Sequence, residues 1–369
     1  MKTLLLCSVV VAVGLLLSSV KIVESDRILN IAHRGSSGVV PEHTVEAYTR
    51  AVKDGADYIE CDLELTSDMQ FICRHEPLLS VTTDVAEHVQ FADRKRTYEF
   101  KGRNVTDWFT VDFTLAEVKQ LRTKQRFNFR NQQFNGQYSV STFDEFVAVA
   151  KQNNVGIYPE IKTPEFYANV NFFPAGVRVE DLVLRALEKH GFTSAEDPCI
   201  VQSFSEEALT YVSSRTHLRL AMLAEEPRTV EDVRRYAAQG FHAFSVSKQF
   251  MVEYSRDEDW PATEGRHKDS ASKFVTFCHE LGLIVHVFTL RNEDRFISWE
   301  FEQDIYKELS YFIDSGVDGI FTDFPSTLDQ YLDCFSCSFN PNRSKATSNF
   351  CVALLFLCFC LIVPLFVLC

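Results

Sequence analysis

Strand-like and helix-like segments alternate along most of the chain, and this alternation constrains the fold more than any other feature. The strand-like segments are short, apolar and rich in β-branched residues, as buried parallel strands are; they are 28–33, 58–66, 70–76, 155–162, 199–205, 218–225, 243–247, 283–290 and 319–325. The helix-like segments are 43–55, 141–154, 179–191, 205–215, 228–240 and 271–282, and several end beside a glycine. Eight βα-like units predict an α/β fold of the (β/α)8 TIM-barrel type, with a doubly wound open sheet as the alternative.

One segment, about 78–138, breaks this alternation after the second strand region. It is long, polar and dotted with aromatic residues. A stretch of this length inside a barrel is rarely a passive loop, so we expect a small insertion over one face. Its basic residues are Arg94, Lys95, Arg96, Lys101 and Arg103. Such a run is more typical of a solvated surface than of a site that attracts an anionic substrate.

The two ends of the sequence are apolar, and we exclude them from the fold. Within residues 1–24, one lysine near the start is followed by an apolar run that ends in small residues, which is typical of a cleaved signal peptide. Residues 350–369 are uncharged, long enough to span a bilayer, and preceded by a polar spacer at 336–349. This pattern predicts a GPI-attachment signal, with a single C-terminal transmembrane helix as the alternative.

These ends place the barrel within 25–335 and predict a protein of the secretory pathway, held at the cell surface by its C-terminal tail. The net charge of −14 argues against a nucleic-acid partner. Sequons at Asn104 and Asn342 permit glycosylation in that pathway. The sequence leaves the oligomeric state open.

Six cysteines lie outside the two apolar ends, which is too few over this length for a disulfide scaffold. They are Cys61, Cys73, Cys199, Cys278, Cys334 and Cys337. Some can pair in an oxidising compartment, and the spacing makes Cys334 and Cys337 the easiest candidates.

The first strand runs into the segment "IAHRGSSGVVPEHT", residues 31–44. The strand ends at His33 and Arg34, and a helix is expected after Pro41. Chemistry in α/β proteins is placed at the carboxyl ends of strands, so His33 is a candidate catalytic residue. The glycines of this segment are expected to let backbone and substrate come close.

An acidic row stands in the next strand, where alternation puts Glu60, Asp62 and Glu64 on one face. Unpaired carboxylates inside a barrel are costly, and one divalent cation, Ca²⁺ or Mg²⁺, would neutralise them through hard oxygen ligands. A solvent-facing strand is the alternative, and it suits a sheet edge better than a barrel.

Further strand ends carry Glu160, Lys162 and His75. Glu160 and Lys162 share a face, where they form either a salt bridge or a metal ligand and a phosphate contact. Two histidines with three carboxylates suit phosphodiester cleavage, because one histidine can accept a proton from the attacking hydroxyl while the other protonates the leaving oxygen. Arg34, Lys162 and Arg291 are candidates to stabilise charge on the phosphoryl oxygens.

Three other histidines carry weaker signals. His279 is expected at a helix surface, and His43 at a helix entrance, where it can orient Glu42. His286 either lines the site or is a satisfied core histidine.

Several motifs together resemble the glycerophosphodiester phosphodiesterase family, and are similar to the periplasmic bacterial type. They are "IAHRGSSGVVPEHT", "GADYIECDLELTSD", "RHEPLLSVTTDV", "YPEIKTP", "VQSF", "HVFTLR" and "GIFTDFP", and the resemblance covers about residues 28–332. It implies a TIM barrel that hydrolyses glycerophosphodiesters to sn-glycerol 3-phosphate and an alcohol.

The resemblance also implies roles for particular residues. His33 and His75 match the catalytic pair of the family. The positions that match its divalent-metal ligands are Glu60, Asp62 and Glu160, and those near the substrate phosphate are Arg34, Glu42 and Lys162. The implied route is attack by the glycerol 2-hydroxyl to give a cyclic phosphate that water opens, with His33 as base and His75 as acid in the first step.

The sequence departs from the family in two places. Glu76 follows His75 where many members have aspartate, and Phe288 or Thr289 stands where tryptophan is common. An aromatic loop at 165–177 is expected at the mouth of the site, where it can contact the alcohol or a lipid chain.

Two other functions remain as alternatives. One is a lysophospholipase D or sphingomyelinase D-like activity on lipid. The other, a non-catalytic surface binding module, is disfavoured because all five catalytic and metal-binding positions are present.

Overall fold

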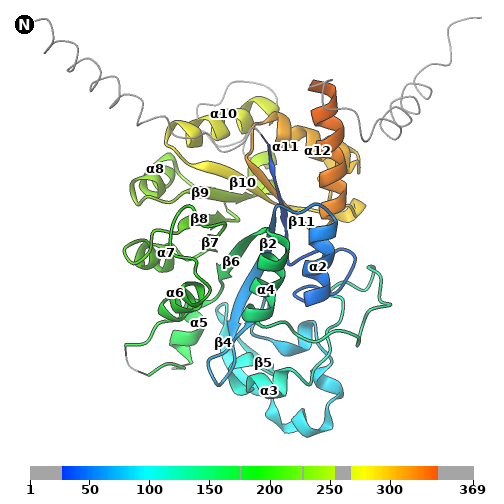
Figure 1. Ribbon diagram of the computed structural model, residues 1–369, viewed down its shortest axis with the longest axis vertical. Coiled ribbons are helices and arrows are strands. Elements are labelled where there is room, and N and C mark those ends of the chain that lie inside the picture. The colour runs from blue at the N-terminus through cyan, green and yellow to red at the C-terminus, as the bar shows by residue number, and fades with distance from the viewer. Residues whose placement is uncertain (1–26, 171, 175, 227, 254–266, 340–369) are drawn as a thin grey trace, which may run out of the picture.

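Eight parallel strands close into a barrel in the computed structural model, which describes residues 27–170, 172–174, 176–226, 228–253 and 267–339 (Figure 1). The barrel strands are β1 Leu29–Ala32, β2 Tyr58–Leu65, β6 Gly156–Ile161, β7 Ile200–Ser203, β8 Arg219–Ala224, β9 Ala243–Ser247, β10 Ile284–Leu290 and β11 Gly319–Thr322. Because β1 pairs in parallel with both β2 and β11, the sheet closes on itself. The predicted TIM barrel is confirmed, and the open doubly wound sheet is excluded.

Helices cover the outside of this barrel (Figure 1). They are α2 Val45–Lys53, α4 Phe143–Asn153, α5 Pro164–Asn169, α6 Val179–Lys189, α7 Glu206–Ser213, α8 Val230–Ala238, α9 Lys248–Glu253, α10 His267–Glu280, α11 Ile305–Asp314 and α12 Pro325–Phe339, with short 3-10 turns at Asp294–Phe296 and Trp299–Phe301. Capping boxes begin α4 at Thr142 and α8 at Thr229. Each box satisfies backbone N–H groups that a helix start leaves without partners.

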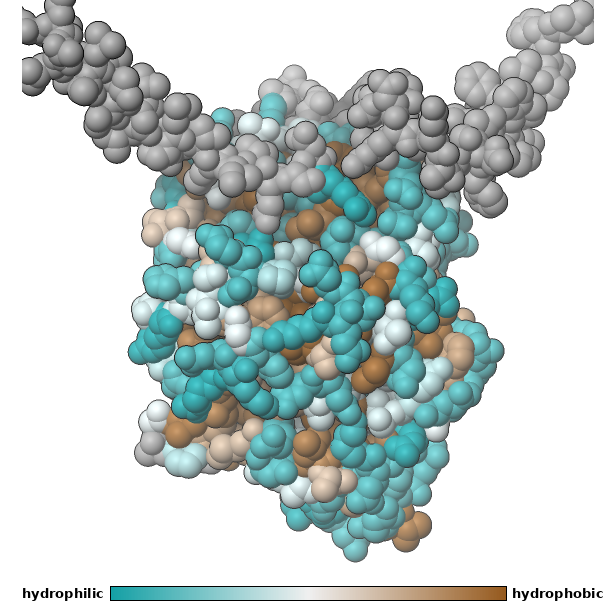
Figure 2. Space-filling model, viewed as in Figure 1, coloured by the Kyte–Doolittle hydropathy of each residue, from teal (hydrophilic) through white to brown (hydrophobic). Residues whose placement is uncertain are grey.

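Two apolar regions hold the barrel together. The larger lies between the outer face of the sheet and the helices, and includes Phe146, Val201 and Phe244. The smaller fills the barrel interior, where Tyr158 and Phe321 pack edge to face. The surface in the view of Figure 2 is mainly hydrophilic, with apolar residues scattered over it.

The predicted insertion is confirmed, and it lies at one end of the barrel (Figure 1). It follows β3 Phe71–Cys73, which pairs antiparallel with β2. Its elements are the 3-10 turns Leu79–Val81, Val85–Glu87, Val89–Arg94 and Thr110–Asp112, the hairpin β4 Arg96–Phe100 and β5 Arg103–Asp107, and α3 Leu115–Val118. Phe91, Trp108 and Phe113 belong to an apolar core of the insertion itself.

The basic run of the insertion divides between two roles. Arg94 pairs with Glu117, and the Lys95 ammonium lies over the ring of Trp108. Lys101, at the tip of the β4–β5 hairpin, instead reaches the main cavity. The surface interpretation therefore holds for part of the run but not for Lys101.

A disulfide joins Cys61 of β2 to Cys73 of β3, with Cα atoms 5.6 Å apart. The sequence had not singled out this pair. The expected pairing of Cys334 with Cys337 stays a prediction, because the Cys337 side chain lies outside the described residues.

The apolar ends, 1–24 and 350–369, lie outside the described residues, as does most of the expected spacer at 336–349. Among the helices that the structure describes, none combines the length and apolar character needed to cross a membrane. Asn104 is exposed on β5, whereas Asn342 is outside the described part.

Candidate active site

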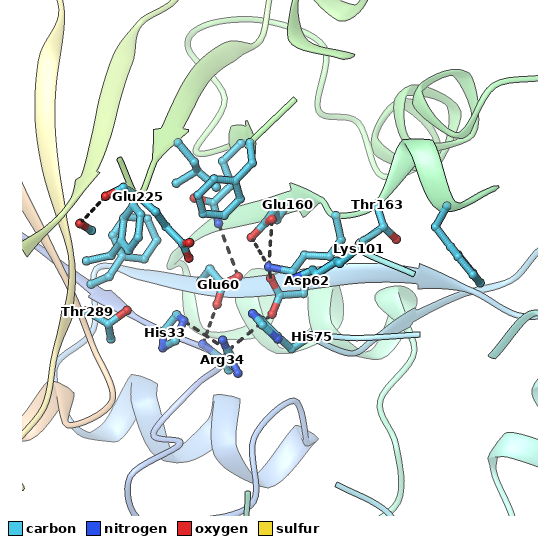
Figure 3. A pocket seen from close by; sticks show the side chains of 18 of the residues that line it. His33, Arg34, Glu60, Asp62, His75, Lys101, Glu160, Thr163, Glu225 and Thr289 are labelled. Carbon is cyan, nitrogen blue, oxygen red and sulfur yellow. Dashed lines mark hydrogen bonds and ion pairs between the residues drawn. The ribbon is translucent and has the colours of Figure 1, made fainter. Parts of the chain in front are cut away.

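A cavity of about 770 Å³ opens at the carboxyl ends of the barrel strands (Figure 3). Seven of the predicted site residues line it: His33, Arg34, Glu60, Asp62, His75, Glu160 and Lys162. Arg291 lines it as well. Glu42 does not, because it lies buried behind Arg34, whose guanidinium is 3.3 Å from both Glu42 carboxylate oxygens.

The turn after β1 sets the position of Arg34. Arg34 has a left-handed backbone (φ 61°), which is uncommon for a residue with a side chain. Its N–H donates to Glu60 Oε2 at 2.7 Å, so the strained turn is tied to the acidic cluster.

The glycines of this turn have a different role from the one expected. A Cβ on Gly35 would lie 2.7 Å from the carbonyl carbon of Ala47 on α2, and one on Gly38 would lie 2.3 Å from the Phe324 ring. Neither glycine lines the cavity. They are required for close packing of the turn, not for the approach of a substrate.

Three carboxylates converge from β2 and β6, whose register pairs Asp62 with Glu160. One oxygen from each of Glu60, Asp62 and Glu160 lies within 4.8 Å of the others, and all three side chains are buried. Burial and the neighbouring Asp62 charge raise the pKa of Glu60 well above its ordinary value. Hard, buried and crowded oxygen donors of this kind fit a divalent cation such as Mg²⁺ or Ca²⁺.

Lys162 is a cation that pairs with two members of this trio. Its Nζ lies 3.3 Å from Asp62 Oδ1 and 3.0 Å from Glu160 Oε1. Although burial alone would raise the pKa of Asp62, the Lys162 charge and the hydrogen bond with His43 hold it well below its ordinary value. With Arg34, whose Nε lies 3.5 Å from Asp62 Oδ2, two cations face three carboxylates, which strengthens the fit to a metal ion.

Glu64, the third member of the expected acidic row, is not part of the trio. Its carboxylate accepts hydrogen bonds from Tyr167 at 2.5 Å and from Thr163 at 3.3 Å, away from the cavity wall. Burial raises the pKa of Glu64 to about 8, so it is mostly protonated at neutral pH. Glu64 therefore has a structural role, in which it binds Tyr167 and Thr163.

His33 is oriented by a buried aspartate that the sequence analysis missed. Its Nδ1 donates to Asp323 Oδ1 at 2.6 Å, and its Nε2 accepts from Arg34 Nε at 3.2 Å. Burial, assisted by the Arg34 charge, lowers the pKa of His33 to about 4. The ring is therefore neutral at physiological pH, with an unprotonated Nε2.

His75 has the same arrangement in the same cavity. Its Nδ1 donates to Glu76 Oε1 at 2.6 Å. Burial first, and then the charges of Arg34 and Lys162, lower the pKa of His75 well below its ordinary value. Each histidine thus has its Nδ1 fixed by a carboxylate, which leaves Nε2 as the nitrogen for proton transfer.

Two further histidines are outside the cavity. His43 is fully buried and contacts Asp62 Oδ2 at 2.8 Å and the Tyr48 hydroxyl at 2.8 Å, so it holds a metal-ligand candidate and not Glu42. His286 lies inside the barrel, 2.9 Å from the Tyr158 hydroxyl, and is a core histidine.

Aromatic rings form much of the remaining cavity wall: Phe100, Phe166, Phe204, Phe288 and Phe321. The expected aromatic loop contributes only in part. Phe166 and Asn169 reach the cavity, whereas Tyr167 is buried against Glu64.

The sequence contained a signal for one of the missed residues. Asp323 follows β11 within "GIFTDFP", at a strand end equivalent to that of His33. Arg126 and Arg130, which hold Glu76 and Asp323, had no such signal because they lie in the insertion.

A closed (β/α)8 barrel with two neutral histidines around buried carboxylates defines an enzyme site for acid–base chemistry. The family model described as glycerophosphoryl diester phosphodiesterase matches residues 33–327. The chain therefore belongs to this family and is an enzyme of the phosphodiesterase class.

Curated relatives agree with this assignment. The chain is 40% identical over 328 residues to glycerophosphodiester phosphodiesterase GDPD6 of Arabidopsis thaliana, covering 85% of this chain and 88% of that protein. It is 29% identical over 308 residues to a Bacillus subtilis glycerophosphodiester phosphodiesterase, covering 81% and 85%.

The solved structures show the fold. A phosphodiesterase of Oleispira antarctica in complex with the product sn-glycerol-3-phosphate matches with a TM-score of 0.56 at 20% identity, covering 82% of this chain and 96% of that one. The glycerophosphodiester phosphodiesterase of Thermotoga maritima matches with a TM-score of 0.51 at 20% identity, covering 83% and 99%.

Proposed function

We propose that this enzyme hydrolyses glycerophosphodiesters to sn-glycerol 3-phosphate and an alcohol in the cavity at the strand ends. The observation that carries the proposal is that His33 and His75 line one cavity together with the acidic trio. The family assignment supports it, and so does the product named for the Oleispira antarctica relative.

His33 is suited to remove the proton from the attacking glycerol 2-hydroxyl. Its Nε2 carries a lone pair, and Asp323 fixes the ring and stabilises the imidazolium that forms. The hydroxyl would attack the phosphorus atom, which gives a cyclic phosphate. In the second step the same nitrogen returns its proton as water opens the ring.

His75 is suited to protonate the leaving alcohol. Its pKa is low in the structure because burial and the charges of Arg34 and Lys162 disfavour its cationic form. A bound phosphodiester is an anion, and its charge beside these two cations raises the pKa of His75. Substrate binding therefore prepares the acid for its proton transfer.

Arg34 and Lys162 are suited to hold the non-bridging phosphoryl oxygens. Both line the cavity and lie beside the acidic trio. A divalent cation on Glu60, Asp62 and Glu160 would stabilise negative charge on the phosphoryl group as a Lewis acid. Ca²⁺ and Mg²⁺ both suit these ligands.

Product analysis by ³¹P NMR tests the reaction. Purified enzyme with glycerophosphocholine is expected to yield sn-glycerol 3-phosphate and choline. His33→Ala and His75→Ala are each expected to lower kcat by about 10²–10⁴-fold, and EDTA is expected to abolish turnover until a divalent cation is restored. Turnover that survived both EDTA and His33→Ala would refute the proposal.

A lipid substrate is the second candidate, and the aromatic cavity wall favours it. Phe100, Phe166 and Phe204 line the cavity and could contact an acyl chain. The same assay with lysophosphatidylcholine separates the two functions. Release of choline from glycerophosphocholine, with the lysolipid left intact, would exclude the lipid-directed activity.

For localisation, we propose the secretory pathway and the cell surface, with a GPI anchor as the membrane contact and a transmembrane helix as the alternative. The apolar segments 1–24 and 350–369 support this, together with the resemblance to a periplasmic type. The Cys61–Cys73 disulfide supports an oxidising compartment. Release from intact cells by a phosphatidylinositol-specific phospholipase tests the anchor, and retention, with control anchors released, would favour the transmembrane helix.

A further inference from the structure

Arg126, in the segment between α3 and α4, binds two buried carboxylates at once. Its Nη1 and Nη2 donate to the two oxygens of Glu76 at 2.9 and 2.8 Å. Its Nε and Nη2 donate to the two oxygens of Glu42 at 2.7 and 2.6 Å. Both carboxylates are thus held in the bidentate geometry that the planar guanidinium favours.

Through Glu76, Arg126 is connected to His75, the proposed general acid. The same Glu76 Oε1 that accepts from Arg126 also accepts from His75 Nδ1 at 2.6 Å. The ring cannot turn while keeping this bond unless Glu76 moves, and movement of Glu76 breaks its pairing with Arg126. The bidentate contact of Arg126 with Glu76 therefore fixes the direction in which His75 Nε2 points.

Arg130 lies four positions after Arg126. It is connected in the same way to His33, the proposed general base, through Asp323. Its Nη2 donates to Asp323 Oδ2 at 2.6 Å, while Asp323 Oδ1 accepts from His33 Nδ1 at 2.6 Å. Its Nε donates to Glu293 at 2.6 Å, and its side chain is almost fully buried. Asp323 Oδ2 also accepts from Arg291 at 2.6 Å, so this carboxylate has two arginines.

The segment that carries both arginines is fastened to the turn after β1. Gln125 Nε2 and Arg130 Nη1 both donate to the Ser37 carbonyl, at 3.0 and 3.1 Å. The cavity wall, as far as described residues form it, includes neither Arg126 nor Arg130. The two arginines therefore act through other residues and do not contact the substrate.

We infer that Arg126 and Arg130 are positioning residues, through which the insertion orients the two catalytic histidines: Arg126 acts on His75 through Glu76, and Arg130 on His33 through Asp323. The inference rests on the proposed function, because it assigns His75 to protonation of the leaving alcohol and His33 to activation of the hydroxyl. It makes the insertion part of the catalytic apparatus.

Two substrates with different leaving groups test whether Arg126 acts on His75 and Arg130 on His33. Glycerophosphocholine loses an alkoxide, which needs a proton, whereas glycerophospho-p-nitrophenol loses a phenolate, which departs without one. Arg126→Ala is expected to lower kcat/KM for alcohol release about 10–100-fold with glycerophosphocholine, and much less with the aryl substrate. Arg130→Ala is expected to lower kcat/KM by the same factor with both substrates. This factor is about 10 or less, because Arg291 still holds Asp323.

Two further measurements exclude a general loss of structure. Arg126→Lys keeps the charge but not the fork, so it is expected to show the same leaving-group dependence as Arg126→Ala. Added guanidinium is expected to restore part of the glycerophosphocholine activity of Arg126→Ala. Lys124→Ala, which removes a cation of the same segment that pairs with exposed Glu87, is the matched control and should leave both substrates unaffected.

The outcomes separate this inference from the proposed function. If His75→Ala discriminates between the two substrates and Arg126→Ala, with a wild-type Tm, does not, the positioning role is overturned. A similar loss for Lys124→Ala and Arg126→Ala would overturn it too. If His75→Ala itself loses the same factor on both substrates, the acid assignment of the proposed function fails instead.

Discussion

The two walls of the cavity differ in how firmly their side chains are held. The wall from β1, β2 and β6 consists of charged groups that bind one another, as in the contact of Arg34 N–H with Glu60 and of Lys162 with Asp62. The wall from β7 to β10, called the aromatic wall below, carries two rings among polar side chains, and Phe204 meets Phe288 edge to face at 6.0 Å. Rings that pack without directional bonds tolerate exchange better than an interlocked set of charges.

This difference predicts that the chemistry and the choice of alcohol depend on different sides of the cavity. Changes on the charged wall should alter rate and stability for all substrates. Changes on the aromatic wall should alter the ratio between substrates.

The largest effect is expected from the acidic trio. Asp62→Asn removes a charged oxygen from a site suited to a divalent cation, and several kcal/mol of lost transition-state stabilisation corresponds to about a 10³-fold decrease in kcat/KM. Steady-state kinetics with metal in excess measures it.

Glu64→Gln is the matched control on the same strand. Because the pKa of Glu64 is raised to about 8 by burial, the amide replaces an acid that is already neutral at pH 7. Its activity should remain within about threefold of wild type, since surrounding contacts are kept. A loss as large as that of Asp62→Asn would break the distinction between catalytic and structural carboxylates.

The next effect concerns the disulfide behind the charged wall. Cys61 lies between Glu60 and Asp62 in the chain, and Cys73 lies two residues before His75. Replacing both cysteines by alanine is expected to lower the free energy of unfolding by about 2–4 kcal/mol, measured by urea denaturation. Dithiothreitol should destabilise wild type and leave the double variant unchanged; equal sensitivity of both would contradict the prediction.

A smaller effect is expected from the titration of His33. Its pKa is about 4 in the folded chain, against an ordinary value of 6.5. Between these values the unfolded chain binds a proton that the folded chain does not, so stability falls as the pH decreases from 6.5 to 4, by up to about 3 kcal/mol. His33→Asn should show a shallower decrease over this window. Identical profiles would show that His33 is not held neutral by burial.

The smallest effect belongs to the aromatic wall. Phe204→Ala is expected to reduce the preference for a choline ester over a neutral glycerol ester by up to about 10-fold, because a quaternary ammonium group favours an aromatic face. Competition between glycerophosphocholine and bis(glycero)phosphate measures this ratio. Phe204→Leu keeps apolar bulk without the ring, and should lose the same preference. An equal loss of rate on both substrates would contradict the distinction between the charged wall and the aromatic wall.

The sequence predicted the parts of this molecule that follow from periodicity. Alternation in β2 placed Glu60 and Asp62 together, and strand ends carried His33, His75 and Glu160 to the cavity. The same alternation put Glu64 in the acidic row, although Glu64 lies outside the trio and the cavity, because strand periodicity does not show where the cavity ends along a strand. The place of Gly35 in the loop after the first strand predicted a role at the substrate, although the contact that requires a glycine comes from α2.

Contacts between distant segments were beyond the reach of these patterns. Asp323 stands 290 positions from His33, and Arg126 stands 84 positions from Glu42. The Cys61–Cys73 pair depended on the antiparallel register of β3, which only the folded sheet supplies.

The fastening of the insertion to both histidines has a consequence for protein engineering. An insertion of this kind invites exchange between related barrels as a way to transfer substrate preference. Here Arg126 and Arg130 each need a carboxylate supplied by the barrel, at Glu76 and Asp323. A chimera that took the insertion alone would leave these acids or these arginines without their counterparts. The unit that can be transferred between barrels is the insertion together with the strand ends that carry Glu76 and Asp323.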